Sequence, residues 1–365
     1  MKFVCEGIVL SDAALTVNKA CAVKTLNPVL ECIKISAQND VITLVAYDGE
    51  ISIEKKLNAE VIEEGEVCVN GRLFTDFIGK VSGKPVSVYT GDKGIEIRYD
   101  DSVSFMQALS ADEFPEIRKD KGDNSFRVKN SDLKKLIGKT VFCCATEDSR
   151  PILKGCLLEV YDNKLHATAL DGYRMAVSEC EAFGEEKSKI VCPARTLTEI
   201  SRMIETDGEE LEISFTRNTM SVCVGDTYLI SRLYTGEFVN KNNIFPNAFK
   251  TKLTCFKNEI IESVERASVL IRGDKNNLIL MDIKAGGVYL SANSEFGNVS
   301  ETVKGQLEGE ELKIAMNAKY LLDALKALDG ERVVISFNSP IAPFTLENQE
   351  GGESAYLVLP VRTNA

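Results

Sequence analysis

Apolar residues recur along this chain with two rhythms, one helical and one strand-like. In each third of the chain, a short opening strand is followed by a stripe with the spacing i, i+3, i+4, i+7, which predicts an amphipathic helix. The opening strands are expected at Lys2–Cys5, Ser125–Val128 and Lys252–Cys255, and Ser131 and Asp132 supply N-cap chemistry for the second helix of this kind. The stripes are Leu10, Ala13, Ala14, Val17, Ala20 and Cys21; Leu133, Leu136, Ile137, Thr140, Cys143 and Cys144; and Ile260, Ser263, Val264, Ala267, Leu270 and Ile271.

A further helical stripe comes later in each third. Its positions are Leu73, Phe74, Phe77, Ile78 and Val81; Thr196, Leu197, Ile200, Ser201 and Ile204; and Tyr320, Leu321, Ala324, Leu325 and Leu328. The stretches between and after these helices alternate apolar and polar residues, as in Leu211–Phe215 and Val333–Phe337, and predict strands.

Two unrelated landmarks share one period. The dipeptides Asp48-Gly49, Asp171-Gly172 and Asn293-Ser294 are separated by 123 and 122 residues. The later helical patterns begin at Asn70, Pro193 and Asn317, separated by 123 and 124 residues. This period is domain-sized, far longer than a solenoid unit of about 20–50 residues. We therefore predict an α+β protein made of three tandem copies of a two-helix plus antiparallel-sheet domain, over residues 1–122, 123–248 and 249–365.

Composition sets the class of protein. With 365 residues and 44% hydrophobic content, each third has enough material for its own core. The chain has no uninterrupted apolar run of about 18 residues and no signal-peptide pattern, so we expect a soluble, cytoplasmic protein. Its 11 cysteines lie in apolar strings such as Phe142–Ala145 without metal-type spacing, and we interpret them as reduced core thiols.

The net charge of −12 argues against a nucleic-acid binder, but the placement of the basic residues matters more than their sum. Outward positions of the later helix are basic in every copy, and the first helix of copy two adds three lysines. These residues are Arg72, Lys80, Arg195, Arg202, Lys319 and Lys326, with Lys134, Lys135 and Lys139. Two interpretations stay open: solvated helix faces with i, i+4 ion pairs, or a basic surface within an acidic protein.

Chemistry for catalysis is missing. The single histidine, His166, excludes a histidine-based triad and a two-histidine metal site, and its strand context indicates packing or a local hydrogen bond. The sequence has neither a Walker loop nor a GxGxxG fingerprint. We expect a non-catalytic binding protein without a cofactor or metal.

Two sequence blocks resemble bacterial DNA sliding clamps, the β subunits of DNA polymerase III. The central block, Ala167–Val177, reads ATALDGYRMAV, and the C-terminal block, Ala355–Arg362, reads AYLVLPVR. The resemblance runs the whole length, from Met1-Lys2-Phe3 through Lys24–Leu30 and Arg150–Gly155.

The resemblance implies a head-to-tail homodimer that closes a ring of six domains around double-stranded DNA, with helices lining the hole. Twelve helices with axes about 9 Å apart span roughly 110 Å, so the axis circle is about 35 Å wide and leaves room for a duplex and water. The dimer interface is expected where Phe105 of one subunit meets the apolar Val269 and Leu270 of the other. The recurring basic residues, with Lys24 and Arg150 added, would face phosphates across water.

The resemblance also implies a pocket between the second and third domains that holds DNA polymerase, the clamp loader and repair proteins by short peptides. Carried over by position, it comprises Leu153, Leu170, Gly172, Tyr173, Arg174, Met175, Ile244, Pro343, Leu357, Val358, Leu359, Pro360, Val361 and Arg362. Without the resemblance, these positions would be interpreted as core and edge-strand residues. Phe238–Lys241 departs from the family pattern, and Thr363–Ala365 runs past its usual end, so partner preference stays open.

The implied function is that of a DNA polymerase processivity factor. The alternative is a threefold-repeat protein-interaction scaffold without a nucleic-acid role, which the charge of −12 favours slightly. The two differ in whether the basic helix positions point into a closed ring.

Overall fold

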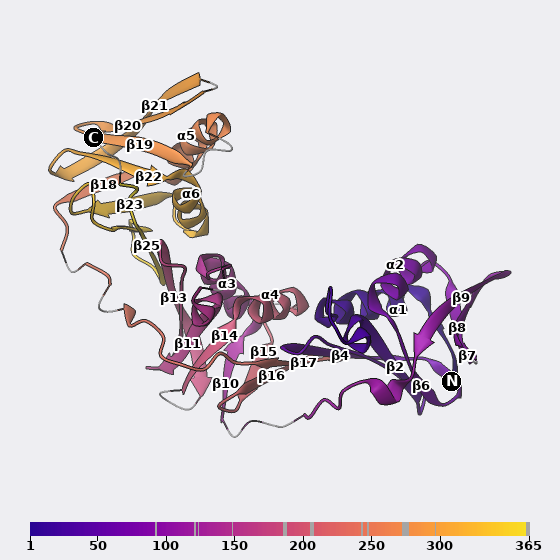
Figure 1. Ribbon diagram of the computed structural model, residues 1–365. Coiled ribbons are helices and arrows are strands. Elements are labelled where there is room, and N and C mark those ends of the chain that lie inside the picture. The colour runs from indigo at the N-terminus through magenta and orange to yellow at the C-terminus, as the bar shows by residue number, and fades with distance from the viewer. Residues whose placement is uncertain are drawn as a thin grey trace. The chain divides into compact units, whose positions relative to one another are not determined.

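The computed structural model describes residues 1–91, 93–119, 122, 124–147, 149–184, 188–204, 208–241, 244–246, 248–271, 277–295 and 297–362. The chain folds into two compact units (Figure 1). The first unit is Met1–Arg127 with Glu199–Leu233, and the second is Val128–Thr198 with Tyr234–Ala365. The units therefore do not follow the predicted copy boundaries, which remain a prediction. The predicted extension Thr363–Ala365 lies outside the described residues.

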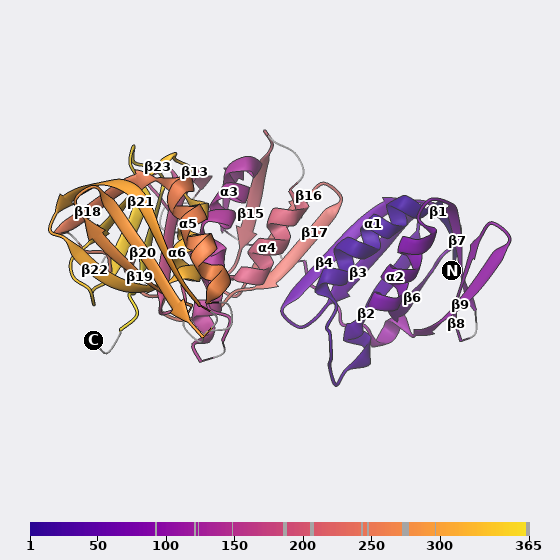
Figure 2. The ribbon, with the colours of Figure 1, turned by 90° about the horizontal axis from the view of Figure 1, so that it is seen from above.

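The first unit contains the first copy and the end of the second. Its helices α1 (Gly7–Val17) and α2 (Gly71–Val81) pack side by side (Figure 2). The strands of the first copy are β1 (Lys2–Glu6), β2 (Cys32–Gln38), β3 (Val41–Tyr47), β4 (Ile51–Asn58), β5 (Glu60–Glu63), β6 (Gly65–Asn70), β7 (Pro85–Gly91), β8 (Gly94–Tyr99) and β9 (Ser102–Leu109). The second copy contributes β15 (Glu210–Phe215), β16 (Thr219–Val224) and β17 (Thr227–Arg232).

The second unit contains the start of the second copy and the third copy. Its helices are α3 (Asn130–Thr140), α5 (Lys257–Leu270) and α6 (Ala318–Ala327). Its strands are β11 (Gly155–Tyr161), β12 (Lys164–Leu170), β13 (Arg174–Gly184), β14 (Ser188–Pro193), β18 (Thr251–Phe256), β19 (Leu278–Lys284), β20 (Gly287–Ser294), β21 (Gly297–Gly309), β22 (Leu312–Asn317), β23 (Arg332–Phe337), β24 (Phe344–Asn348) and β25 (Ser354–Val358). Strand β10 (Asn124–Lys129) and helix α4 (Ala194–Met203) each contain a point where the units divide.

The helices bury the apolar stripes that the sequence predicts. Every predicted position of the three first-helix stripes is buried except Leu270, which is half-buried. The expectation for Leu73 was wrong, because its side chain is 60% exposed while Phe74, Ile78 and Val81 are buried. These three follow i, i+4, i+7, and Leu73 lies about 100° around the helix from Phe74, off that stripe. No helix among the described residues is long and apolar enough to span a membrane.

The residue that marks the start of the later helix in each copy is a helix N-cap in the first and third copies. Asn70 Oδ1 accepts the amide of Leu73 at 3.0 Å, and Asn317 Oδ1 accepts the amides of Lys319 and Tyr320. Each side chain satisfies helix-end donors that the helix itself leaves unpaired.

The N-cap prediction for Ser131 and Asp132 was wrong. Helix α3 begins at Asn130, and its N-cap residue Lys129 makes no side-chain capping hydrogen bond. Both residues therefore lie within the first turn, where the carboxylate of Asp132 still favours the positive end of the helix dipole.

The Asp-Gly landmark is a tight turn between paired strands. Asp48 Oδ1 accepts the amides of Glu50 and Ile51, both at 2.9 Å, at the turn from β3 to β4. At the turn from β12 to β13, Asp171 Oδ1 accepts the amides of Tyr173 and Arg174. Gly172 has φ of 93°, which a residue with a side chain rarely adopts. In the third copy, the hairpin from β20 to β21 takes this place, with Ser294 opposite Gly297.

One strand pairing joins neighbouring copies in both units. The strand after the tight turn of one copy pairs antiparallel with the last strand of the next copy. In the first unit Ser52 of β4 lies opposite Ile230 of β17, and in the second unit Met175 of β13 lies opposite Leu357 of β25. Two strands remain: β9, the last strand of the first copy, and the first half of β21, which follows the turn of the third copy. Neither pairs with a strand of another copy in the part of the chain that the structure describes.

The cysteines are free, and all but Cys223 are buried, which confirms their interpretation as core thiols. Burial raises the pKa of Cys68 to about 12 and that of Cys255 to about 12. A thiolate is the reactive form, so both burial and pKa protect these side chains.

We expect a thiol reagent to modify one cysteine of the folded protein quickly and the others only after denaturation. Colorimetric thiol counting in native buffer and in guanidinium measures both numbers. A Cys223→Ser variant should lose the fast reaction. Fast modification of several thiols in that variant would contradict the buried assignment.

Candidate functional site

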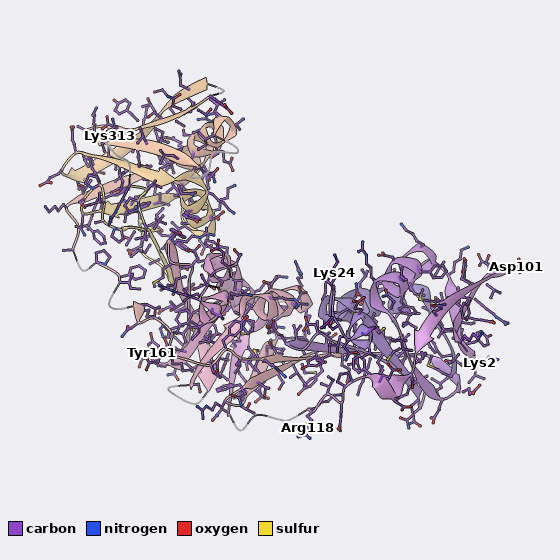
Figure 3. All side chains as sticks on the ribbon, in the orientation of Figure 1. Lys2, Lys24, Asp101, Arg118, Tyr161 and Lys313 are labelled. Carbon is purple, nitrogen blue, oxygen red and sulfur yellow. The ribbon has the colours of Figure 1, made fainter. Side chains whose placement is uncertain are left out.

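The predicted DNA-facing cations lie on exposed positions, with one exception. Arg72 and Lys80 are exposed on α2, Lys134 and Lys135 on α3, Arg195 and Arg202 on α4, Lys319 and Lys326 on α6, and Lys24 (Figure 3) and Arg150 on loops. Lys139 differs, since its side chain is 12% exposed and pairs with Asp329 at 2.5 Å. That ion pair makes Lys139 a contact between α3 and the segment after α6, and leaves it little available to a phosphate.

Several of these cations share their charge with an acid nearby. Arg202 pairs with Glu199 at 2.6 Å, Lys326 with Glu265 at 2.6 Å, and Arg72 with Asp76 at 3.9 Å. The last two pairs are exposed on both sides, and such ion pairs contribute little to stability, whereas Glu199 is buried. Lys24, Lys80, Lys135, Arg150 and Lys319 make no ion pair within the described residues. A polyanion would therefore meet some cations whose charge is partly neutralised by a neighbouring acid.

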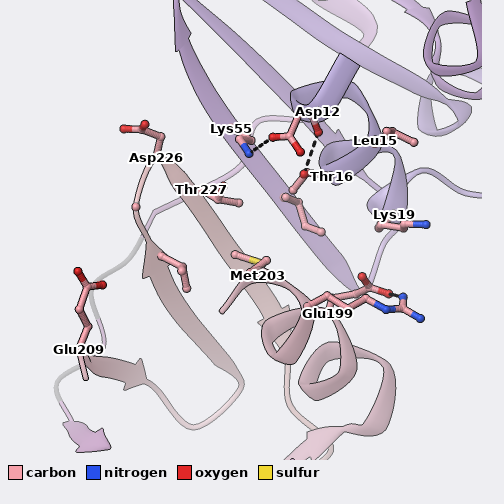
Figure 4. A pocket seen from close by; sticks show the side chains of 14 residues that line it. Asp12, Leu15, Thr16, Lys19, Lys55, Glu199, Met203, Glu209, Asp226 and Thr227 are labelled. Atoms are coloured by element: carbon pink, nitrogen blue, oxygen red, sulfur yellow. Dashed lines mark hydrogen bonds and ion pairs between the residues drawn. The ribbon is translucent and has the colours of Figure 1, made fainter. Parts of the chain in front are cut away.

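A groove of about 510 Å³ lies in the first unit between α1, β4, the end of α4 and the turn from β16 to β17 (Figure 4). Lys55 pairs with Asp12 at 2.5 Å, and Arg202 pairs with Glu199. The walls of the groove carry four acidic and three basic residues, together with Leu15, Thr16, Ile53, Met203, Val224, Gly225 and Thr227. The charged residues are Asp12, Glu199, Glu209, Asp226, Lys19, Lys55 and Arg202. This groove offers no net positive charge to a phosphate backbone.

The predicted peptide pocket corresponds to an apolar cluster in the second unit. Its buried members are Leu153, Leu157, Leu170, Met175, Val191, Phe238 and Leu357. Partly buried side chains surround them: Ala145, Ile152, Val177, Tyr234, Val239, Ile244, Phe245 and Leu359. Most of the apolar residues carried over by resemblance thus meet in one place, on strands of two different copies and on the segment between them.

Sequence reasoning missed part of this cluster. Leu157 and Val191 belong to its buried centre, and Tyr234 and Phe245 to its edge. Phe238, from the segment that departs from the family pattern, also belongs to the buried centre. The dipeptide Glu113-Phe114 recurs as Glu237-Phe238, 124 residues later, and Phe114 is likewise buried, in a cluster with Val29, Cys32 and Cys68.

The counterpart cluster in the first copy has a different lining. By position in the hairpin, Tyr47 stands where the second copy has Leu170, and Ser52 where it has Met175. The hydroxyl of Tyr47 donates to the carbonyl of Gly49 at 3.0 Å, which fixes that ring. Adaptable apolar side chains at these positions are therefore particular to the second copy.

The other predicted pocket residues lie around the C-terminal segment. Tyr173 is 61% exposed and stacks on Tyr320, with ring centroids 6.1 Å apart. Its carbonyl accepts the amide of Leu359 at 2.8 Å. Val358 is buried, Pro343, Pro360 and Val361 are half-buried, and Arg362 is exposed.

Arg174 connects the second and third copies. Its guanidinium donates to Asp171 Oδ2 at 3.1 Å, to Asp323 Oδ2 of α6 at 2.6 Å and to the carbonyl of Phe142 at 2.8 Å. It also lies over the ring of Tyr320, 4.6 Å from the centroid. Burial opposes its charge, but the hydrogen bond to Asp323 and the nearby carboxylates raise the pKa of Arg174. With its side chain only 9% exposed, Arg174 supports the cluster from behind more than it presents a donor to a ligand.

His166 makes local contacts, as its strand context indicated. Its Nδ1 lies 3.1 Å from Glu179 Oε2, and its ring stacks on Tyr161 with centroids 3.6 Å apart. Burial and the neighbouring Lys241 lower the pKa of His166, against the opposing effect of Glu179. The imidazole is therefore neutral at neutral pH, with Nδ1 donating to the carboxylate.

Three copies of one α+β domain, with successive copies joined strand to strand, define a clamp fold. Three family models match the chain in succession: the N-terminal domain of the DNA polymerase III beta subunit at residues 1–118, the central domain at 127–240 and the C-terminal domain at 242–362. The chain therefore belongs to the DNA polymerase III beta subunit family.

Relatives and solved structures agree with this assignment. The chain is 33% identical to a beta sliding clamp of Staphylococcus epidermidis, over 94% of this chain and 95% of the relative. It is 31% identical to that of Halalkalibacterium halodurans over the full length of both. The sliding clamp structure from Bacillus subtilis superposes with a TM-score of 0.94 at 29% identity, covering 100% of this chain and 99% of the other. A putative DNA polymerase III beta subunit from Eubacterium rectale gives 0.93 at 29% identity, covering all of both chains.

We expect Arg174→Met to lower the free energy of unfolding by roughly 3 kcal/mol, because it leaves two partly buried carboxylates without their counter-ion. Urea denaturation measures the change. Arg72→Met is the matched control: its side chain is 86% exposed, and the change should stay within about 0.5 kcal/mol. Equal losses in the two variants would show that the Arg174 contacts contribute nothing special.

Proposed function

We propose that this protein is a processivity clamp, in which two chains close a ring around duplex DNA and tether DNA polymerase and other proteins. The observation that carries the proposal is the strand pairing between copies that both units share. Among the described residues it leaves β9 and the first half of β21 without a partner strand from another copy. The clamp has no catalytic role of its own: its work is to hold partners on DNA.

The pairing rule predicts the register of the subunit contact. The turn from β16 to β17 begins with Val224 opposite Thr227, and the turn from β8 to β9 with Tyr99 opposite Ser102, so Ser102 corresponds to Thr227. Counting on, Phe105 corresponds to Ile230. Asn298 likewise stands at the same position after the turn from β20 to β21 as Ser52 after the turn from β3 to β4 and Met175 after the turn from β12 to β13.

Because Ile230 lies opposite Ser52, we propose that Phe105 of one chain lies opposite Asn298 of its partner. In the same register Val103 lies opposite Ser300. This pairing satisfies backbone groups that each edge strand otherwise leaves to solvent.

Side chains near these edges suit a subunit contact. Phe105 is 58% exposed and Val269 is 65% exposed, so both offer apolar surface to a partner. The carbonyl of Leu270 accepts the hydroxyl of Ser294 at 2.7 Å, at the hairpin that leads into β21. The end of α5 and the start of β21 are thus neighbours, so an approaching β9 would cover both.

We propose that the protein attracts DNA by long-range electrostatics and does not bind it tightly. The exposed cations on the helices would attract phosphates independently of sequence, and the ion pairs within each face keep that attraction weak. The net charge of −12 discourages DNA from binding elsewhere on the protein. Closure of the ring, and not affinity, would then keep the clamp on its template.

The clamp loaded on nicked circular DNA should remain there in moderate salt and depart once the circle is linearised, because only topology retains it. Gel filtration of the loaded DNA before and after cleavage measures retention. In a Lys80→Ala/Lys319→Ala variant, loading should become weaker and should fall less steeply with salt, because fewer phosphates are neutralised, while retention on intact circles persists. Equal loss from circular and linear DNA would contradict the ring.

For partners, we propose that the apolar cluster of the second unit binds short peptides. It combines adaptable side chains such as Met175 and Leu359 with polar groups: the carbonyl of Tyr173 accepts the amide of Leu359, and the exposed Arg362 follows three residues later. This combination suits a peptide with apolar anchors and a polar head. A few anchors would supply most of the affinity.

A peptide with a glutamine followed by leucines and a phenylalanine should bind the full chain at micromolar strength. Met175→Ala/Leu359→Ala should weaken binding at least about tenfold, or 1.4 kcal/mol, because two apolar contacts are lost. Titration calorimetry measures the affinity. Ile62→Ala/Phe183→Ala, which truncates exposed apolar residues outside the cluster, should leave it unchanged. An unaltered affinity in the first variant would place the peptide site elsewhere.

A further inference from the structure

The segment that departs from the family pattern, Phe238–Lys241, forms one side of the apolar cluster. Phe238 is part of the buried centre, and Val239 packs against it. The carbonyl of Lys241 accepts the amide of Ile244 at 3.0 Å and that of Phe245 at 3.3 Å. Both of these residues pack against the cluster. Lys241 is therefore the point at which the segment turns back to bring two further apolar side chains onto the predicted peptide site.

The side chain of Lys241 is fixed on a neighbouring strand. Its Nζ donates to the hydroxyl of Tyr161, the last residue of β11, at 3.2 Å, and lies 5.8 Å from the centroid of that ring (Tyr161 is labelled in Figure 3). A cation held by both a hydroxyl and a ring face is more firmly positioned than a solvated lysine. The turn that starts at Lys241 is thereby attached to the sheet.

Tyr161 is itself held from behind. The ring of His166 stacks on it at 3.6 Å with an interplanar angle of 6°, and His166 Nδ1 contacts Glu179. Lys241, Tyr161, His166 and Glu179 thus form a row from a cation through two rings to a carboxylate. Each member of the row contacts the next.

We propose that Lys241 is a positioning residue for the peptide site, and that its contact with Tyr161 holds the turn bearing Ile244 and Phe245 against the apolar cluster. This inference rests on the proposed peptide-binding function. In this proposal the Lys241 side chain does not contact the peptide. It raises peptide affinity by holding Ile244 and Phe245, which the peptide does contact, in place.

The row also makes the site sensitive to pH. His166 is flanked in register by Glu159 on β11 and Glu179 on β13, which pair with Lys189 and Lys164 respectively. Lys241 is the further cation near the stacked rings. Because the pKa of His166 is lowered by burial and by Lys241, its neutral form is favoured in the folded state. As pH falls through that lowered pKa, a second cation appears beneath Tyr161 and repels Lys241, so peptide affinity should fall with pH.

Peptide calorimetry on the full chain tests the proposal. At about pH 7.5, Lys241→Met should weaken binding of the glutamine-leucine-phenylalanine peptide at least fivefold, and Lys241→Arg should restore it to within twofold. The wild-type affinity should fall as the pH is lowered below about 6.5, the ordinary pKa of histidine, and His166→Asn should flatten that dependence. Lys313→Met, which removes an exposed lysine on β22, is the matched control and should bind as the wild type does.

Hydrogen exchange of the segment 239–246 gives a second readout without peptide. Lys241→Met should increase exchange of the Ile244 and Phe245 amides, and Lys241→Arg should not. If wild-type protein binds the peptide and Lys241→Met binds it equally well, the positioning role is wrong while the peptide site stands. If wild-type protein does not bind the peptide, the proposed function of the cluster fails, and the positioning role fails with it.

Discussion

The structure depends on one backbone ladder, in which the strand after the tight turn of one copy pairs with the last strand of the next. Edge strands carry unpaired amides and carbonyls that must find a partner or remain solvated. Pairing of β4 with β17 and of β13 with β25 satisfies two such edges. Three copies joined in this way leave two edges without a partner from another copy: the strand after the turn of the third copy, β21, and the last strand of the first copy, β9. A second chain is the simplest partner for both, and two chains then close on each other without leaving a free edge.

The same ladder builds the candidate peptide site. Met175 and Leu357 lie opposite each other in the pairing of β13 with β25, so apolar side chains from two copies meet in one cluster. Arg174, next to Met175, binds Asp323 of α6 and fixes that meeting from behind. The segment around Lys241 adds the remaining wall. The site is therefore a product of how two copies join, since either copy alone supplies only part of its lining.

Sequence reasoning predicted what is local and periodic. The buried stripes of the first helices follow from the spacing of apolar residues, and the structure confirms them. The Asp-Gly and asparagine landmarks were recognised from their period alone, and the structure shows that they are turns and helix caps. Sequence reasoning could not predict that β15–β17 pack with the first copy, because that depends on pairing between distant strands. It also placed Arg174 at the peptide site without showing that Asp171 and Asp323 occupy its donors. The error at Leu73 concerns which face of the helix it occupies, and those at Ser131 and Asp132 place the cap two or three residues too late. Periodicity alone determines neither.

The proposed ring requires that β9 of one chain pair with β21 of another in the register of the internal junctions. Cysteine cross-linking tests this pairing directly, in a Cys223→Ser background that removes the exposed native thiol. Val103→Cys/Ser300→Cys should oxidise to a covalent dimer linked at both junctions, since directly opposed residues lie within reach of a disulfide. Val103→Cys/Thr302→Cys, shifted by two residues, should cross-link poorly. Equal yields from the two pairs, or a ladder of higher oligomers from the first, would contradict it.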